Sequence, residues 1–263
     1  MEGFMEMDQI LNYMKRTMRI IVALTLLLGS VLSAQGQNFT YKWERVAMDT
    51  TWMGDGTSEV EKVIQRYQPG IEFLMEIVGY SSEELSKKNP ESGLSNLAAD
   101  ALLFAAGPYL KPGDAAMAVT NFGGIRANLP KGAIRKYDIF STFPFDNTIV
   151  IVDIQGKDLR RILNNFAKRE RFEVLSGVEI VVKDKKMVKC NVAGKPLNDN
   201  KIYKLVTIDF LLDGGDSMRI GSSATHIERT DAFVRDGVEK YIRSKSEQGV
   251  VFDNKQDGRI VIK

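Results

Sequence analysis

Strand-like and helical segments alternate along residues 94–262, and this alternation constrains the fold more than any other feature of the sequence. Residues 148–154 are rich in β-branched side chains, which strands favour. In residues 159–166 the apolar side chains recur at i, i+3, i+4 and i+7, which is helical spacing. Residues 178–182 and 187–192 flank a polar turn and indicate a β-hairpin. The sequence therefore predicts an α/β (α+β) fold, a single domain with a mixed β-sheet flanked by helices.

Several further elements follow from the same patterns. We expect helices over residues 58–78, 94–104 and 232–242, and strands over residues 117–120, 202–208 and 259–262. Pro69 and Gly70 interrupt the first of these segments, which therefore forms either two helical pieces or one kinked helix.

The N-terminal segment has the pattern of a secretory signal peptide. A basic cluster at residues 15–19 precedes an apolar run at residues 20–32, and small residues follow. A run of this length spans about 20 Å as a helix, which is short of the roughly 30 Å hydrocarbon layer that a membrane anchor must cross. We therefore expect export with cleavage after Ala34 or Gly36, and no stable membrane anchor.

This interpretation divides the chain into a signal peptide, residues 1–36, and a mature domain, residues 37–263. The residues before Met14 are acidic, whereas a signal peptide begins with a positively charged segment. We therefore expect translation to start at Met14. The expected location is periplasmic or secreted. The single cysteine, Cys190, does not follow the apolar run, which excludes a bacterial-type lipid anchor there, and we expect it to be an inert core thiol.

The charge balance and the histidine count exclude several functions. Lys and Arg number 36 against 34 Asp and Glu, a net charge of +2, which provides no global field for nucleic acid or an anionic membrane. The chain holds one histidine, His226, so it cannot build the His-rich forms of a Ser-His-Asp or two-metal hydrolytic centre by itself. We expect His226 to be a surface or packing residue, and we assign no catalytic residue and no metal ligand to this chain.

A first loop, residues 121–126, combines glycines with an amide and a cation. Gly123 and Gly124 permit close approach of the backbone to a ligand. Asn121 supplies an amide, and Arg126 supplies a guanidinium that can pair with phosphate or carboxylate in two hydrogen bonds. Taken alone, the loop favours a simple glycine turn that carries a surface arginine.

Two further loops carry aromatic and acidic residues. The second loop, residues 143–147, has two phenylalanines around a proline, and the third loop, residues 210–216, ends in Gly-Gly-Asp. Phe145 and Phe210 could stack on a ligand or belong to the core. Asp216 could accept hydrogen bonds from sugar hydroxyls, as an acidic residue does in dinucleotide folds, or could simply form a turn.

The sequence motifs of these loops, and the order in which they occur, resemble those of a known family. Asn-Phe-Gly-Gly-Ile-Arg, Phe-Pro-Phe-Asp-Asn and Asp-Phe-Leu-Leu-Asp-Gly-Gly-Asp occur in the order seen in the C-terminal domain of 5'-nucleotidases. Two outlying motifs also match: residues 90–97 with Asp100 in the following helix, and residues 257–260. The resemblance covers roughly residues 58–263, and within it residues 58–78 correspond to the segment that joins the two domains of full-length enzymes.

The resemblance implies a role for each loop. A purine is clamped between two phenylalanines, which are Phe145 and Phe210 in this sequence. Asn121 and Arg126 contact phosphate and ribose, and Asp216 binds the ribose hydroxyls. The implied ligand is a nucleoside 5'-monophosphate or a nucleoside, with base preference and phosphate count left open.

The sequence departs from the family at some positions. Asp209 stands where the family has Asn before the clamp phenylalanine, and Lys87 and Lys88 stand where it has a further Arg. Lysine is a point charge and does not reproduce the arginine fork.

The sequence also lacks Asp-x-His, Gly-Asn-His and Gly-His-x-His, the motifs of the metallophosphatase domain of these nucleotidases. The resemblance therefore implies the substrate-binding half of a split 5'-nucleotidase with no cofactor of its own, whose divalent metals reside in a separate metallophosphatase partner. The alternatives are a stand-alone nucleotide-binding protein without catalysis and a structural domain with a decayed pocket.

Overall fold

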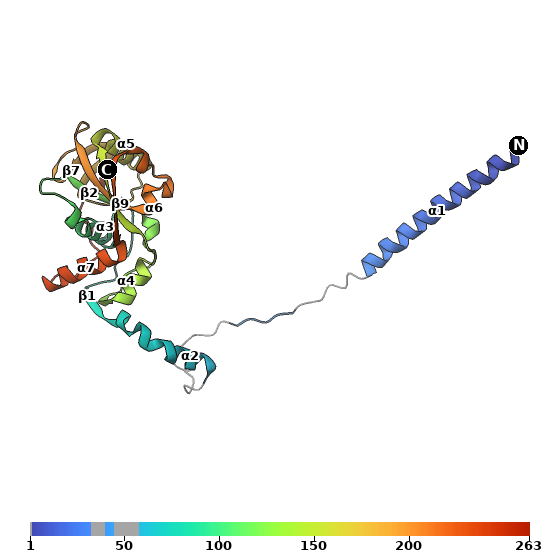
Figure 1. The fold of residues 1–263 in the computed structure, drawn as a ribbon, viewed down its shortest axis with the longest axis horizontal. Coiled ribbons are helices and arrows are strands. Elements are labelled where there is room, and N and C mark those ends of the chain that lie inside the picture. The colour runs from blue at the N-terminus through green and yellow to red at the C-terminus, as the bar shows by residue number, and fades with distance from the viewer. Residues whose placement is uncertain (1, 33–39, 45–57) are drawn as a thin grey trace. The chain divides into compact units, whose positions relative to one another are not determined.

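The computed structural model describes residues 2–32, 40–44 and 58–263 (Figure 1). The chain divides into two units, Met1–Ser58 and Glu59–Lys263. In the first unit, helix α1 spans Glu2–Leu32 and contains the apolar run of the sequence. Within the described ranges, no helix is both long and apolar enough to cross a membrane. The expected cleavage positions after Ala34 and Gly36 lie outside the described residues.

The second unit contains all the remaining elements, in mixed order. Its helices are α2 (Glu59–Tyr67), η2 (Gln68–Met75), α3 (Gly93–Ala105), η3 (Gly107–Tyr109), η4 (Phe122–Gly124), α4 (Lys136–Thr142), α5 (Gly156–Arg169), α6 (Asp209–Leu212), η5 (Gly215–Ser217), η6 (Gly221–Ser223) and α7 (Val234–Glu247). Its strands are β1 (Ile77–Ser81), β2 (Ala116–Thr120), β3 (Gly132–Arg135), β4 (Thr148–Gln155), β5 (Val174–Ser176), β6 (Val178–Lys183), β7 (Lys186–Val192), β8 (Lys195–Pro196), β9 (Ile202–Ile208), β10 (Ala224–Phe233) and β11 (Ile260–Ile262).

The strands form three sheets, and parallel and antiparallel pairs occur together, as the predicted mixed sheet requires. The largest has the order β10-β4-β9-β2-β5, in which β2 and β9 run parallel and the other pairs are antiparallel. A second sheet has the order β11-β6-β7-β8, and β1 pairs with β3. Helix α3 packs on β2, β5 and α7, while α5 packs on β4 and β7. The mixed α/β fold predicted from the sequence is therefore confirmed.

The central sheet brings the three loops to one edge. Strands β2 and β9 are parallel neighbours, so the first and third loops, which follow them, leave the sheet at the same end. Strand β4 is antiparallel to β9, with Ile149 opposite Ile208, so the second loop enters β4 at that same end. Ligands in open sheets of this kind bind where strand ends meet in this way.

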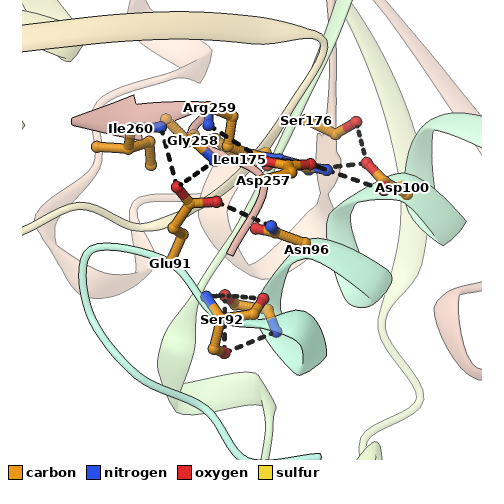
Figure 2. Close-up of polar contacts among 11 residues, drawn as sticks. Glu91, Ser92, Asn96, Asp100, Leu175, Ser176, Asp257, Gly258, Arg259 and Ile260 are labelled. Atoms are coloured by element: carbon orange, nitrogen blue, oxygen red, sulfur yellow. Dashed lines mark hydrogen bonds and ion pairs between the residues drawn. The ribbon is translucent and has the colours of Figure 1, made fainter. Parts of the chain in front are cut away.

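Buried polar contacts tie the C-terminal strand to α3 (Figure 2). The Glu91 carboxylate accepts hydrogen bonds from the Asn96 amide at 2.8 Å and from the backbone N–H of Gly258 at 3.0 Å. The Arg259 guanidinium donates to both carboxylate oxygens of Asp100, at 2.8 and 3.0 Å. The two outlying sequence motifs are therefore parts of one structural network that holds β11 in place.

The structure also corrects parts of the predicted elements. Residues 58–78 are not helical throughout, because β1 begins at Ile77, and the second helical piece, η2, is a 3-10 helix. Its proline cannot donate the hydrogen bond that would continue an α-helix from α2. Residues 232 and 233 end strand β10, which the sequence pattern missed, so α7 begins at Val234. Most side chains of β10 are at least partly exposed, which leaves no hydrophobic alternation to detect.

Candidate functional site

The first and third loops meet through a hydrogen bond between two predicted site residues. The Asn121 amide nitrogen donates to a carboxylate oxygen of Asp216 at 2.5 Å. The two glycines of the first loop make room for this amide: a Cβ at Gly124 would lie 2.8 Å from Asn121 Oδ1, and one at Gly123 would lie 3.2 Å from Asn121 Nδ2. Neither glycine has a positive φ, so the constraint at both positions is space.

The Asn121–Asp216 pair leaves hydrogen-bonding capacity for a ligand. Asn121 Oδ1 is buried and has no hydrogen-bond partner among the described residues. A buried polar atom without a partner is costly, by about 1–3 kcal/mol, and such atoms gather at functional sites. Asp216 and Ser217 both have left-handed backbones, with φ of 50° and 60°. Strain of this kind also concentrates at binding sites.

The first and second loops are joined through backbone and ring contacts. The backbone N–H of Arg126 donates to the carbonyl of Thr142 at 2.8 Å. The Arg126 guanidinium carbon lies 5.6 Å from the centroid of the Phe145 ring, which is cation–π distance. Asp146 accepts a hydrogen bond from Arg235 of α7 at 2.7 Å, which anchors the second loop to that helix. Arg126 and Phe145 are therefore placed side by side, as the resemblance requires of two residues that contact one ligand.

The third loop presents Phe210, the second ring that the resemblance assigns to the clamp. A side chain at Gly215 would collide with the Phe210 ring, so only glycine allows the ring to lie across the loop backbone. The neighbouring Gly214 has a φ of 102°, a conformation that glycine adopts without strain. The departure at Asp209 has a structural consequence: its carboxylate accepts hydrogen bonds from the Thr148 hydroxyl at 2.9 Å and from the Phe210 N–H at 2.8 Å. Asp209 is thus engaged in holding the loop to β4.

The rings of Phe145 and Phe210 are half exposed, which distinguishes them from core residues. Phe145 is 45% exposed and Phe210 is 46% exposed, whereas Phe172 is 0% exposed. Phe145 also lines a small cavity of about 20 Å³ together with Asn121 and Gly124. The alternative that both rings are ordinary core residues is therefore wrong.

Two residues near the loops were not assigned a role by the sequence. The Lys87 ammonium donates to the backbone carbonyls of Phe122 and Ile125, at 3.0 and 2.5 Å, and so fixes the shape of the first loop from outside. The Glu173 carboxylate accepts the Phe122 N–H at 2.9 Å. Burial raises the pKa of Glu173, and repulsion from the Asp216 carboxylate adds to this. No motif marks Glu173 in the sequence.

The remaining polar candidates lie elsewhere. His226 is exposed on β10 and is not part of the three loops. Cys190 is buried, and burial raises the pKa of its thiol to about 11, so it remains protonated at neutral pH. In the part of the chain that the structure describes, no group of three or more His, Cys, Asp or Glu side chains is arranged to hold a metal ion. The site offers a guanidinium, an amide, a carboxylate and two exposed rings, which is a set of binding groups.

Comparison with known proteins agrees with this picture. The chain is 32% identical over 103 residues to Protein UshA of Yersinia enterocolitica, a match that covers 38% of this chain and 19% of that protein. It is 28% identical over 191 residues to the trifunctional nucleotide phosphoesterase protein YfkN of Bacillus subtilis, covering 65% of this chain and 13% of that protein. A 5'-nucleotidase precursor of Thermus thermophilus has a similar structure, with a TM-score of 0.64 and 25% identity over 77% of this chain and 42% of that one. The chain thus spans less than half the length of each.

The fold and the loops together define a mixed α/β domain that gathers a candidate ligand site at the ends of its central strands. A model of the 5'-nucleotidase C-terminal domain matches residues 76–221, which is more than half of the 263 residues. The chain belongs to the 5'-nucleotidase C-terminal domain family, which is the substrate-binding domain family of these enzymes.

Proposed function

We propose that this chain is the exported nucleotide- or nucleoside-binding half of a split 5'-nucleotidase and acts with a separate metallophosphatase polypeptide. The observation that carries the proposal is the convergence of the three loops. The Asn121–Asp216 hydrogen bond links the first loop to the third, and the Arg126–Phe145 cation–π contact links the first loop to the second. Each of these residues has the chemistry that a nucleotide needs.

The groups of the site match the parts of a nucleoside monophosphate. The rings of Phe145 and Phe210 offer faces on which a base can stack. The carboxylate of Asp216 can accept hydrogen bonds from ribose hydroxyls, and Arg126 can donate to phosphate. The unpaired oxygen of Asn121 supplies one further acceptor for a hydroxyl or an amino group.

An exposed apolar segment supports the proposed partner. In α2 and η2, which the structure describes completely, none of the residues is buried. Seven large apolar side chains of this segment are at least half exposed: Val60, Val63, Ile64, Tyr67, Ile71, Phe73 and Met75. Large apolar side chains that gather in the exposed part of a domain are typical of an interaction site. We infer that the metallophosphatase covers this segment and brings its metals to the nucleotide.

Reconstitution tests this proposal directly. We expect a metallophosphatase to co-purify with the tagged chain from native extract, and the purified pair to hydrolyse AMP in the presence of divalent metal. Ile64→Asp should weaken the association, because it places a charge in the apolar face of α2. Gln65→Asp, at an exposed position of the same helix, is the matched control and should leave the association intact. A chain that reaches full nucleotide affinity yet never associates with a metallophosphatase would contradict the split-enzyme part of the proposal.

Export has its own test. Mass spectrometry of the native protein should place the mature N-terminus between Ala34 and Asn38. Recovery of an intact N-terminal segment embedded in membrane would refute cleavage.

A further inference from the structure

A basic cavity lies next to the candidate site and shares one residue with it. The cavity has a volume of about 450 Å³ and is bounded by helix α5 and by the residues that follow Gly215. Four of its lining residues are cationic, namely Arg161, Lys168, Arg169 and Arg219. Asp216, which the Asn121 amide holds, forms part of the same wall. Arg126 of the first loop does not line this cavity.

Two of the four cations are already engaged by the protein. Arg161 pairs with Asp158 at 3.0 Å and donates to the Ser223 hydroxyl at 2.8 Å. Arg169 donates to the backbone carbonyl of Asn165 at 3.1 Å. Both arginines lie on helix α5.

The other two cations are uncompensated. Neither the Lys168 ammonium nor the Arg219 guanidinium makes a hydrogen bond or an ion pair with another residue in the described ranges. The charged groups that interact with Glu173 are Asp216, Arg171 and Arg169, and neither Lys168 nor Arg219 is among them. A concave surface with free cations attracts an anion, and a cavity lined by a guanidinium and an ammonium suits a phosphate group.

The position of Asp216 relates this cavity to the nucleotide. Asp216 is the residue to which we assign the ribose hydroxyls, and it both lines the cavity and accepts a hydrogen bond from Asn121 of the first loop. A ribose whose 2' and 3' hydroxyls bond to Asp216 would direct those oxygens toward the cavity, while the 5' phosphate is assigned to Arg126. The two cationic groups are thus separate, and a mononucleotide with one phosphate can satisfy only one of them.

We propose that the basic cavity is a second phosphate site, which accepts a phosphate ester on the 2' or 3' oxygen of the bound nucleotide. This inference rests on the proposed function, and it names nucleoside bisphosphates as a ligand class that the domain prefers over nucleoside monophosphates. Lys168 and Arg219 are the residues that contact the second phosphate.

Calorimetric titration of the full chain tests the inference with AMP, adenosine 3',5'-bisphosphate and adenosine 2',5'-bisphosphate. We expect at least one bisphosphate to bind about tenfold to a hundredfold more tightly than AMP, as one or two charge-assisted hydrogen bonds allow. Inorganic phosphate should compete with that advantage, and added salt should reduce it.

Substitutions of Lys168 and Arg219 test whether these residues contact the second phosphate. Lys168→Gln and Arg219→Gln should lower the affinity for the bisphosphate to that for AMP and leave AMP binding unchanged. Both side chains are exposed, so the melting temperature should not move. Lys183→Gln, at an exposed lysine of the β6–β7 turn, is the matched control and should change neither affinity.

If AMP binds and no bisphosphate binds more tightly, the second site is refuted while the proposed function stands. If neither AMP nor adenosine binds, the proposed function fails and the inference fails with it.

Discussion

Truncation of either clamp ring should reduce ligand binding much more than it reduces stability. Stacking of a base on one aromatic side chain is worth roughly 1–3 kcal/mol. Phe145→Ala and Phe210→Ala should therefore weaken adenosine or AMP binding by about fivefold to a hundredfold. A fully buried phenylalanine costs about 3–5 kcal/mol of stability when truncated, but these rings are 45% and 46% exposed in the unliganded domain. Because the transfer free energy scales with buried area, we expect a smaller stability loss of about 2–3 kcal/mol.

Calorimetric binding and thermal melting of the same variants separate the two effects. Phe172→Ala is the matched control, because this ring is completely buried and its loss should lower the melting temperature sharply without touching the site. Arg126→Ala should weaken AMP binding more than adenosine binding, since its guanidinium is assigned to the phosphate. The clamp assignment is wrong if Phe145→Ala and Phe210→Ala melt like the Phe172 variant while their folded fraction binds adenosine normally.

Three further predictions follow from the network, the loops and the sequence. Arg259→Met should destabilise the domain by about 3 kcal/mol, since it leaves the partly buried carboxylate of Asp100 unpaired. Lys189→Met, at an exposed ion pair, is the control and should not change the melting temperature. Equal effects of the two substitutions would refute a structural role for the network. Glu173→Gln should be at least as stable as the wild type at neutral pH, because the raised pKa of Glu173 makes its ionised form unfavourable in the folded state. That advantage should shrink as the pH falls through the raised pKa of Glu173 and should be gone well below the ordinary Glu pKa of about 4.3, where the carboxyl is protonated in both states. A gap that widens in acid would contradict it. The purified chain should hydrolyse AMP no faster than buffer, even with divalent metal, and phosphate release that survives re-purification would overturn this expectation.

The sequence predicted the elements that bury a clear pattern of apolar residues. The hairpin of β6 and β7, strands β2, β4 and β9 and helices α3 and α5 all have the expected periodicity and were found close to their expected bounds. It also predicted that the three loops carry the site, since their glycine, proline and aromatic residues form recognisable motifs. Which roles these residues play in binding remains a prediction.

The missed features depend on tertiary structure. Strand β10 pairs with β4 by backbone hydrogen bonds but presents mostly exposed or half-exposed side chains, so its sequence resembles that of a loop. Lys87 supports the first loop by contacting carbonyls 35 and 38 residues away, and single-sequence periodicity contains no signal for such a contact. The structural explanation of Gly123 and Gly124 likewise required the position of the Asn121 side chain.

The most direct test of the account is a calorimetric titration of the purified chain with AMP and with adenosine, repeated with the Asp216→Ala variant. The account predicts saturable binding of one nucleotide per chain, and a loss of affinity in the variant for both ligands, because Asp216 is assigned to the ribose that they share. Absence of saturable binding by the wild-type chain, or equal affinity of the wild type and the Asp216→Ala variant, would contradict the central claim that the three loops form a nucleotide site.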